Sequence, residues 1–134
     1  MDKPYPFRPY ESWPENSRQR WLHAAHTFGM HLMQNVRDQA MARIPDDAST
    51  EARRLAEESI FNTMYAVMQL FDGICDLRVD DEHDVSYILN SEVRKREPDS
   101  YETSVCESCE LAPAGDGLCM AIHGWVEGEF WPDM

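Results

Sequence analysis

Three cysteines and one histidine in the C-terminal third are the residues of this sequence with the clearest chemistry: Cys106, Cys109, Cys119 and His123. Two thiols three positions apart, followed by a distant cysteine and histidine four positions apart, form a donor set that can close a tetrahedral zinc site. However, side chains three positions apart on an extended strand point to opposite faces, which opposes joint binding by Cys106 and Cys109. The sequence therefore predicts either a zinc site at these four residues or buried free thiols.

Nucleophilic catalysis by a thiolate–imidazole pair is the other chemistry that these residues allow. Cys119 and His123 would share one face of a helix, where the imidazole can activate the thiol as a nucleophile. The sequence contains no glycine-flanked serine and no phosphate-binding loop. Three more histidines, whose positions suit the polar side of a helix without any metal, are His23, His26 and His31. A Cys/His-dependent enzyme is thus a second alternative, with no catalytic residue assigned.

The chain carries a large excess of negative charge, because 25 Asp and Glu against 12 Lys and Arg give a formal net charge of -13. No Lys or Arg follows Arg96, whereas nine acidic residues do. Nucleic-acid affinity depends largely on cations that neutralise phosphates, so this balance argues against a nucleic-acid partner. An acidic surface instead suits solubility or a basic protein partner.

Aromatic residues close to the C-terminus are the second unusual feature: Trp125, Phe130 and Trp131. Aromatic side chains within a charged rim are typical anchors of a binding face, although a terminal segment of this kind can also dock on its own domain. We predict that these three residues form an interface with a protein partner or with a second copy of the chain.

The expected compartment is the cytoplasm. The first nine residues lack the apolar run of a signal peptide, and no stretch approaches the roughly twenty apolar residues that span a bilayer. We therefore expect no membrane partner. In a reducing compartment the four cysteines are thiols or metal ligands rather than disulfides.

Residues 58–73 predict the central helix of the fold, because they are apolar on nearly all sides and a helix of this kind is buried. Its start is expected near Ser49 or Thr50, which can cap it, and its end at Gly73, which tolerates the left-handed conformation. An earlier amphipathic helix is expected from Ser12 to Ile44. Because only a short connection joins the two helices, they should pair as an antiparallel hairpin.

The remaining segments predict a second structural layer. Alternating apolar residues from Val85 onward predict a β-hairpin over residues 84–112, in which Glu107 is a polar residue on the buried face. Helical spacing predicts a short helix over residues 116–131 that Asp116 can cap. Leu118, Met120 and Ile122 equally fit the alternation of a strand, which is the alternative for this segment.

These elements together predict a single α+β domain over residues 1–134. Its parts are an extended arm (1–11), a long antiparallel helical hairpin (12–74) packed on a small antiparallel β-hairpin or sheet (84–112), and the short C-terminal helix (116–131). The predicted function is that of a small acidic cytosolic protein-interaction or accessory module, non-enzymatic and without a cofactor. The zinc-binding domain is the first alternative, and the Cys/His enzyme is the second.

Overall fold

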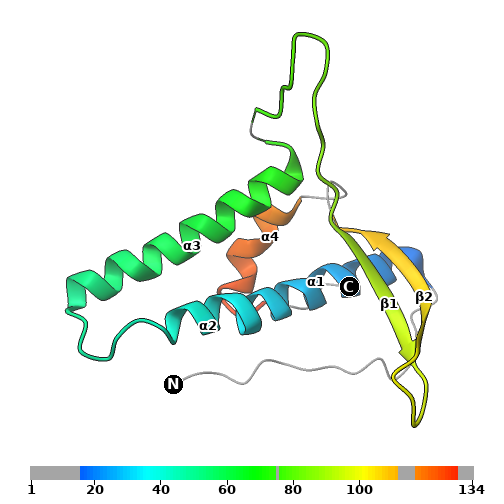
Figure 1. The fold of residues 1–134 in the computed structure, drawn as a ribbon, viewed down its shortest axis with the longest axis horizontal. Helices are drawn as coiled ribbons and strands as arrows, with labels where there is room; N and C mark the ends of the chain where they lie inside the picture. The colour runs from blue at the N-terminus through cyan, green and yellow to red at the C-terminus, as the bar shows by residue number, and fades with distance from the viewer. Residues whose placement is uncertain (1–15, 75, 112–116, 130–134) are drawn as a thin grey trace.

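The computed structural model describes residues 16–74, 76–111 and 117–129, and it combines helices with a two-stranded antiparallel sheet (Figure 1). The α+β class is therefore confirmed. The predicted extended arm and the predicted helix start at Ser12 lie outside the described residues. The elements are α1 (Ser17–Leu32), the π-helical turn η1 (Met33–Arg37), α2 (Asp38–Met41), α3 (Thr50–Asp72), β1 (Asn90–Arg96), β2 (Thr103–Glu110) and α4 (Leu118–Trp125).

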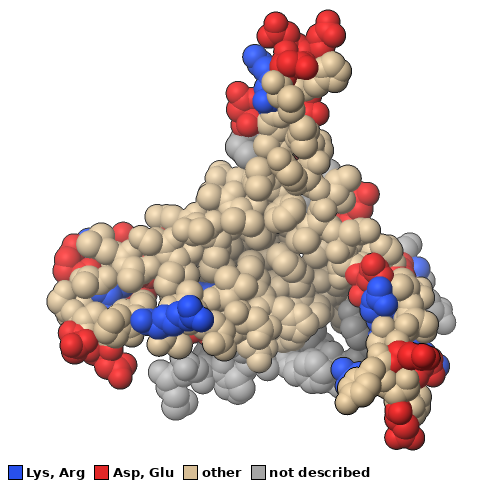
Figure 2. Space-filling model, in the orientation of Figure 1, with Lys and Arg blue, Asp and Glu red and all other residues tan. Residues whose placement is uncertain are grey.

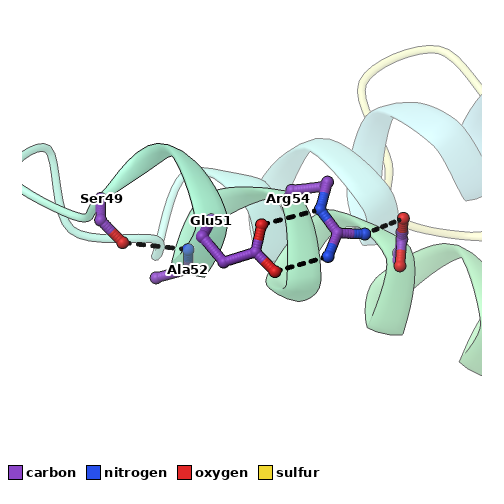
Figure 3. Close-up of polar contacts among 5 residues, drawn as sticks. Ser49, Glu51, Ala52 and Arg54 are labelled. Atoms are coloured by element: carbon purple, nitrogen blue, oxygen red, sulfur yellow. Dashed lines mark hydrogen bonds and ion pairs between the residues drawn. The ribbon is translucent and has the colours of Figure 1, made fainter.

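Helix α3 begins and ends where its sequence predicts. The Ala52 backbone N–H donates to the Ser49 side chain at 3.1 Å, and this cap satisfies one of the free amides of the first turn (Figure 3). Gly73 closes the helix at a φ of 71°, a left-handed conformation that a glycine adopts without a steric penalty.

An exposed ion-pair network covers the first turns of α3. The Arg54 guanidinium donates to both carboxylate oxygens of Glu51, at 2.6 and 3.1 Å, and to Glu58 at 2.7 Å. Pairs at these spacings stabilise a helix by only about 0.2–0.5 kcal/mol each. The network therefore supports α3 locally and contributes little to the tertiary fold.

The first helical segment is not the single uninterrupted helix that the sequence predicts. The turn η1 separates α1 from α2 while the backbone stays in the right-handed helical region, and α2 ends at Met41 rather than at Ile44. A π-bulge adds one residue to a helical turn and so rotates the side chains that follow it around the helix axis. Arg37, at the end of η1, donates through Nη1 to the Val126 carbonyl at the C-terminal end of α4, at 3.4 Å.

The long antiparallel helical hairpin is the part of the predicted fold that the structure does not show. Helix α2 contacts α3 near the loop that connects them, but α1 diverges from α3, and α4 lies between the two and contacts both (Figure 1). The apolar faces of α1 and α3 are therefore buried mainly against α4. Sequence periodicity could not show this, because an apolar face records burial without naming its partner.

The core is built around α4 and the faces turned toward it. Its buried residues are Ala24, Ala25, Met30, Met33, Met64, Met68, Cys109, Leu111, Leu118, Cys119, Ile122 and Trp125. Helix α3 contributes only Met64 and Met68, and Val67 is 41% exposed. The prediction that α3 is buried nearly all round was therefore wrong, because α4 covers one side of it only.

Strands β1 and β2 pair as predicted, with Asn90 opposite Glu110 and Arg96 opposite Thr103. The register shifts between Val93 and Arg94, so that Cys106 is the extra residue of a β-bulge. The predicted start of the first strand near Val85 was wrong. The hairpin's backbone pairing ends where the Leu111 N–H donates to the Leu89 carbonyl at 2.9 Å, and residues 85–88 are exposed.

Two side chains of α1 attach the hairpin to the helices. The Trp21 indole N–H donates to the Glu110 carbonyl at 2.6 Å. Arg20 and Glu107 approach to 2.5 Å as an ion pair, and their side chains are only 21% and 23% exposed. This pair accounts for Glu107 on the inner face, because a partly buried carboxylate needs a compensating charge.

Candidate functional site

Helix α4 carries two of the four predicted zinc donors, and its amino end is held by a side chain from another helix. Asp72, the last residue of α3, accepts hydrogen bonds from the backbone N–H groups of Leu118 at 2.9 Å and Cys119 at 2.7 Å. A carboxylate at this end satisfies free amides and is favoured by the helix dipole. The predicted cap Asp116 lies outside the described residues.

The other end of α4 is fixed by Trp125, which is 1% exposed. Its ring meets Phe28 edge-on at a centroid distance of 5.8 Å, and a Cβ added at Gly29 would overlap it. Its indole N–H donates to His26 Nδ1 at 3.1 Å. Trp125 is therefore a core residue, in contrast to the partner-facing position predicted for it, because α1 presents a glycine that leaves room for the ring.

The rest of the predicted aromatic interface is not described by the structure. Phe130 and Trp131 lie outside the described residues, so their contribution to an interface stays a prediction.

The four predicted zinc donors lie in different surroundings. Cys106 is exposed at the β-bulge, whereas Cys109 and Cys119 are buried. His123 is exposed, and its ring lies 5.4 Å from the Tyr65 ring and 5.9 Å from the Phe61 ring, between centroids. Across the described ranges, no group of three or more His, Cys, Asp or Glu residues is placed to hold a metal ion. The zinc site stays a prediction.

The two buried thiols, Cys109 and Cys119, have raised pKa values. Burial raises the pKa of Cys119, and the hydrogen bond to Asp72 together with the charge of that carboxylate raises it further. Burial raises the pKa of Cys109 as well, with the Glu107 charge adding to the effect and Arg20 opposing it. Hydrogen bonds from the Cys119 and Met120 backbone N–H groups at the start of α4 lower the pKa of Cys119, but they do not cancel the rise. Cysteine nucleophiles instead have pKa values that nearby cations or helix amides lower overall. This environment disfavours Cys119 as a catalytic nucleophile.

Of the three histidines in α1, His26 has a defined structural role. It is half-buried, and its Nδ1 accepts the Trp125 indole hydrogen bond, so it carries no proton on that nitrogen. Burial lowers the pKa of His26, and the neighbouring charge of His23 lowers it further. His26 therefore packs against the core at Trp125, whereas the sequence placed it on the polar side of the helix.

Comparisons with models of protein families, with curated proteins and with solved structures return no match for this chain. Among the described helices, none has the length and apolar character needed to cross a membrane.

The feature that sequence reasoning missed is a set of exposed apolar side chains in the loop that follows α3. Figure 1 shows that this segment, residues 76–89, projects away from the body of the molecule before it returns as β1. We call it the projecting loop. Val79, Val85, Tyr87 and Ile88 are at least 40% exposed there, and Ile74 at its base is 60% exposed. The alternating pattern of residues 85–89 suggested a strand with a buried face, which concealed this surface.

Removing the Asp72 carboxylate should loosen α4. We expect Asp72→Ala to lower the free energy of unfolding by about 1–2 kcal/mol, because two amides at the start of α4 lose their acceptor. Asp76→Ala is the matched control, since Asp76 also accepts a backbone bond, from Arg78 at 3.0 Å, but in exposed surroundings. Urea denaturation followed by circular dichroism measures both. Equal losses in the two variants would show that Asp72 does not hold α4.

Acidification should weaken the contact between α1 and α4. The pKa of His26 is lowered from 6.5 in the folded chain, so the unfolded chain takes up this proton first. The contribution of neutral His26 is complete above pH 6.5 and is lost as the pH falls toward its folded pKa. Denaturation between pH 8 and pH 5 should therefore show a smaller loss in His26→Gln, which keeps an acceptor, than in the parent. His31→Gln, at an exposed position, should behave like the parent.

Metal removal should leave the fold intact. Among the residues that the structure describes, no three metal donors are placed together, so we expect protein purified without chelator to contain far less than one zinc per chain and to melt at the same temperature with or without a strong chelator. Elemental analysis and a thermal melt measure this. About one zinc per chain, lost in Cys106→Ser, would instead support the zinc-binding alternative.

Proposed function

We propose that this chain is a non-enzymatic protein-interaction module that works in the cytoplasm. The observation that carries the proposal is the exposure of large apolar side chains on the projecting loop and at its base. Four of them are at least 47% exposed: Ile74 60%, Val79 63%, Tyr87 47% and Ile88 59%. Water contact with apolar side chains is unfavourable, at about 25 cal/mol per Å², so a partner that covers them gains binding free energy.

The chemistry of the chain supports binding over catalysis. The Cys109 and Cys119 thiols have raised pKa values, and the predicted zinc donors are dispersed over β2 and α4. The net charge of -13 opposes contact with nucleic-acid phosphates. A protein partner can contact both the acidic and the apolar surface of this chain, because protein interfaces combine an apolar centre with a polar rim.

Site-specific photo-crosslinking in the cells that naturally express the chain tests the proposal. A photoreactive amino acid placed at Ile88 or Val79 should yield a protein adduct of discrete mass. The same group at Gln39, an exposed polar position on α2, is the control and should yield none.

Two other results of this experiment have distinct meanings. Adducts from other exposed apolar positions, such as Leu55 or Val105, with none from Ile88, would support the proposed function but place the binding surface outside the projecting loop. No adduct from any exposed apolar position would contradict the function itself.

A further inference from the structure

The tip of the projecting loop is an ordered turn. The Val79 N–H donates to the His83 carbonyl at 2.8 Å, and the Val85 N–H donates to the Leu77 carbonyl at 3.0 Å. The Asp80 carboxylate accepts from the Glu82 N–H at 2.8 Å and contacts His83 Nδ1 at 2.7 Å. A hydrogen-bonded turn loses less conformational freedom on binding than an open loop, so this tip is suited to recognition.

Two kinds of surface follow one another along the loop. The tip carries Asp76, Asp80, Asp81, Glu82 and Asp84 against the single cation Arg78, and Figure 2 shows acidic side chains gathered at the end of this projection. The returning segment of the loop, residues 85–89, contains no charged residue and includes the exposed Tyr87 and Ile88. The projecting loop thus presents an acidic surface at its tip and an adjacent uncharged, partly apolar surface on its returning segment.

The rest of the face in Figure 2 has a related pattern. Charged side chains gather mainly at the ends of the helical and sheet projections, and most of the central surface is free of them. Residues 59–71 of α3 likewise contain no charged residue. On this face, charge repulsion with an acidic molecule is therefore concentrated at the projecting ends, and the acidic tip of the loop is one of them.

We infer that the projecting loop docks into a protein partner whose binding site is an apolar groove with Lys and Arg at its rim. Tyr87 and Ile88 would enter the groove, and the acidic tip would meet the cations. The inference rests on the proposed interaction function and adds the surface and the chemistry of the partner. Charge complementarity favours a basic partner over a second copy, because two chains of net charge -13 repel and bring like-charged tips together.

A synthetic amphipathic peptide made of leucine and lysine is the probe for this surface, with a leucine and glutamate peptide as its counterpart. The full chain should bind the lysine peptide more weakly as salt rises, and should not bind the glutamate peptide. Tyr87→Ser/Ile88→Ser should weaken binding by about tenfold or more, because apolar anchors dominate affinity. Asp81→Asn/Glu82→Gln should slow association and reduce the salt dependence. Isothermal titration and stopped-flow fluorescence measure these effects.

The controls separate this surface from the charge of the whole chain. Leu55→Ser removes an apolar side chain that is 50% exposed near the start of α3, and Asp46→Asn/Asp47→Asn removes two exposed carboxylates before that helix. Both should bind like the parent. Equal effects of the loop and control variants, or no binding by the parent, would overturn the docking inference. Neither result would contradict the proposed interaction function, because the photo-crosslinking experiment tests that function at other exposed positions as well.

Discussion

Met68→Asp is expected to prevent folding. Met68 is 2% exposed in the layer between α3 and α4, and the buried core residues that the structure describes include no cation. An unpaired buried carboxylate costs several kcal/mol, which is comparable with a total stability of about 5–15 kcal/mol for a domain. Circular dichroism and a thermal melt of the variant should show no cooperative transition.

The adjacent residue supplies a matched control. Val67→Asp introduces the same carboxylate on the same helix at a side chain that is 41% exposed, so we expect only a small loss of stability. If the two variants melted alike, the division of α3 into a buried side and an exposed side would be contradicted.

Gly29→Ala is the second substitution with a large expected effect. The added Cβ would overlap the Trp125 ring, which cannot move aside without leaving the core. We expect a loss of about 3 kcal/mol or more, similar to that for removing a buried aromatic side chain, even though alanine favours helices over glycine. Chemical denaturation measures the loss, and near-ultraviolet circular dichroism reports the changed packing of Trp125.

Gly124→Ala is the corresponding control in α4. Its Cβ would meet the Glu129 side chain at 3.2 Å, and that exposed side chain has room to move. The helix propensity of alanine should make this change neutral or stabilising by up to about 1 kcal/mol. A loss as large as that of Gly29→Ala would contradict the specific packing of Trp125 on α1.

Local sequence signals predicted local structure well. Ser49 and Gly73 bound α3 as expected, because capping and the left-handed glycine depend on residues within one turn. The pairing of β1 with β2 was also predictable, since a short turn brings two alternating segments together. Glu107, the polar residue expected on the buried face, was identified correctly, although its partner Arg20 was not.

Contacts between distant elements were beyond the reach of the sequence pattern. Nothing near Asp72 indicates that its carboxylate caps a helix that begins at residue 118. Trp125 was predicted at a surface because aromatic residues suit both interfaces and cores, and only the proximity of Gly29 decides between them. The exposure of Val67 follows in the same way, because α4 covers only one side of α3.

The candidate zinc and enzyme sites depended on tertiary placement even more strongly. The spacing of Cys106, Cys109, Cys119 and His123 matched a donor set, but spacing cannot place β2 against α4. The bulge at Cys106 changes the side-chain alternation before Cys109, and burial with Asp72 raises the pKa of the Cys119 thiol. The exposed surface of the projecting loop is therefore a stronger basis for a function than these four residues.

Sedimentation velocity of the full chain, at low and at high salt, tests most directly whether the exposed apolar side chains bind a different, basic protein rather than a second copy of this chain. We predict a monomer under both conditions, for the parent and for Trp131→Ala alike, because two chains of net charge -13 repel each other. A dimer that strengthens as salt screens this charge, and that Ile88→Ser or Trp131→Ala abolishes, would contradict the account and identify a second copy as the partner.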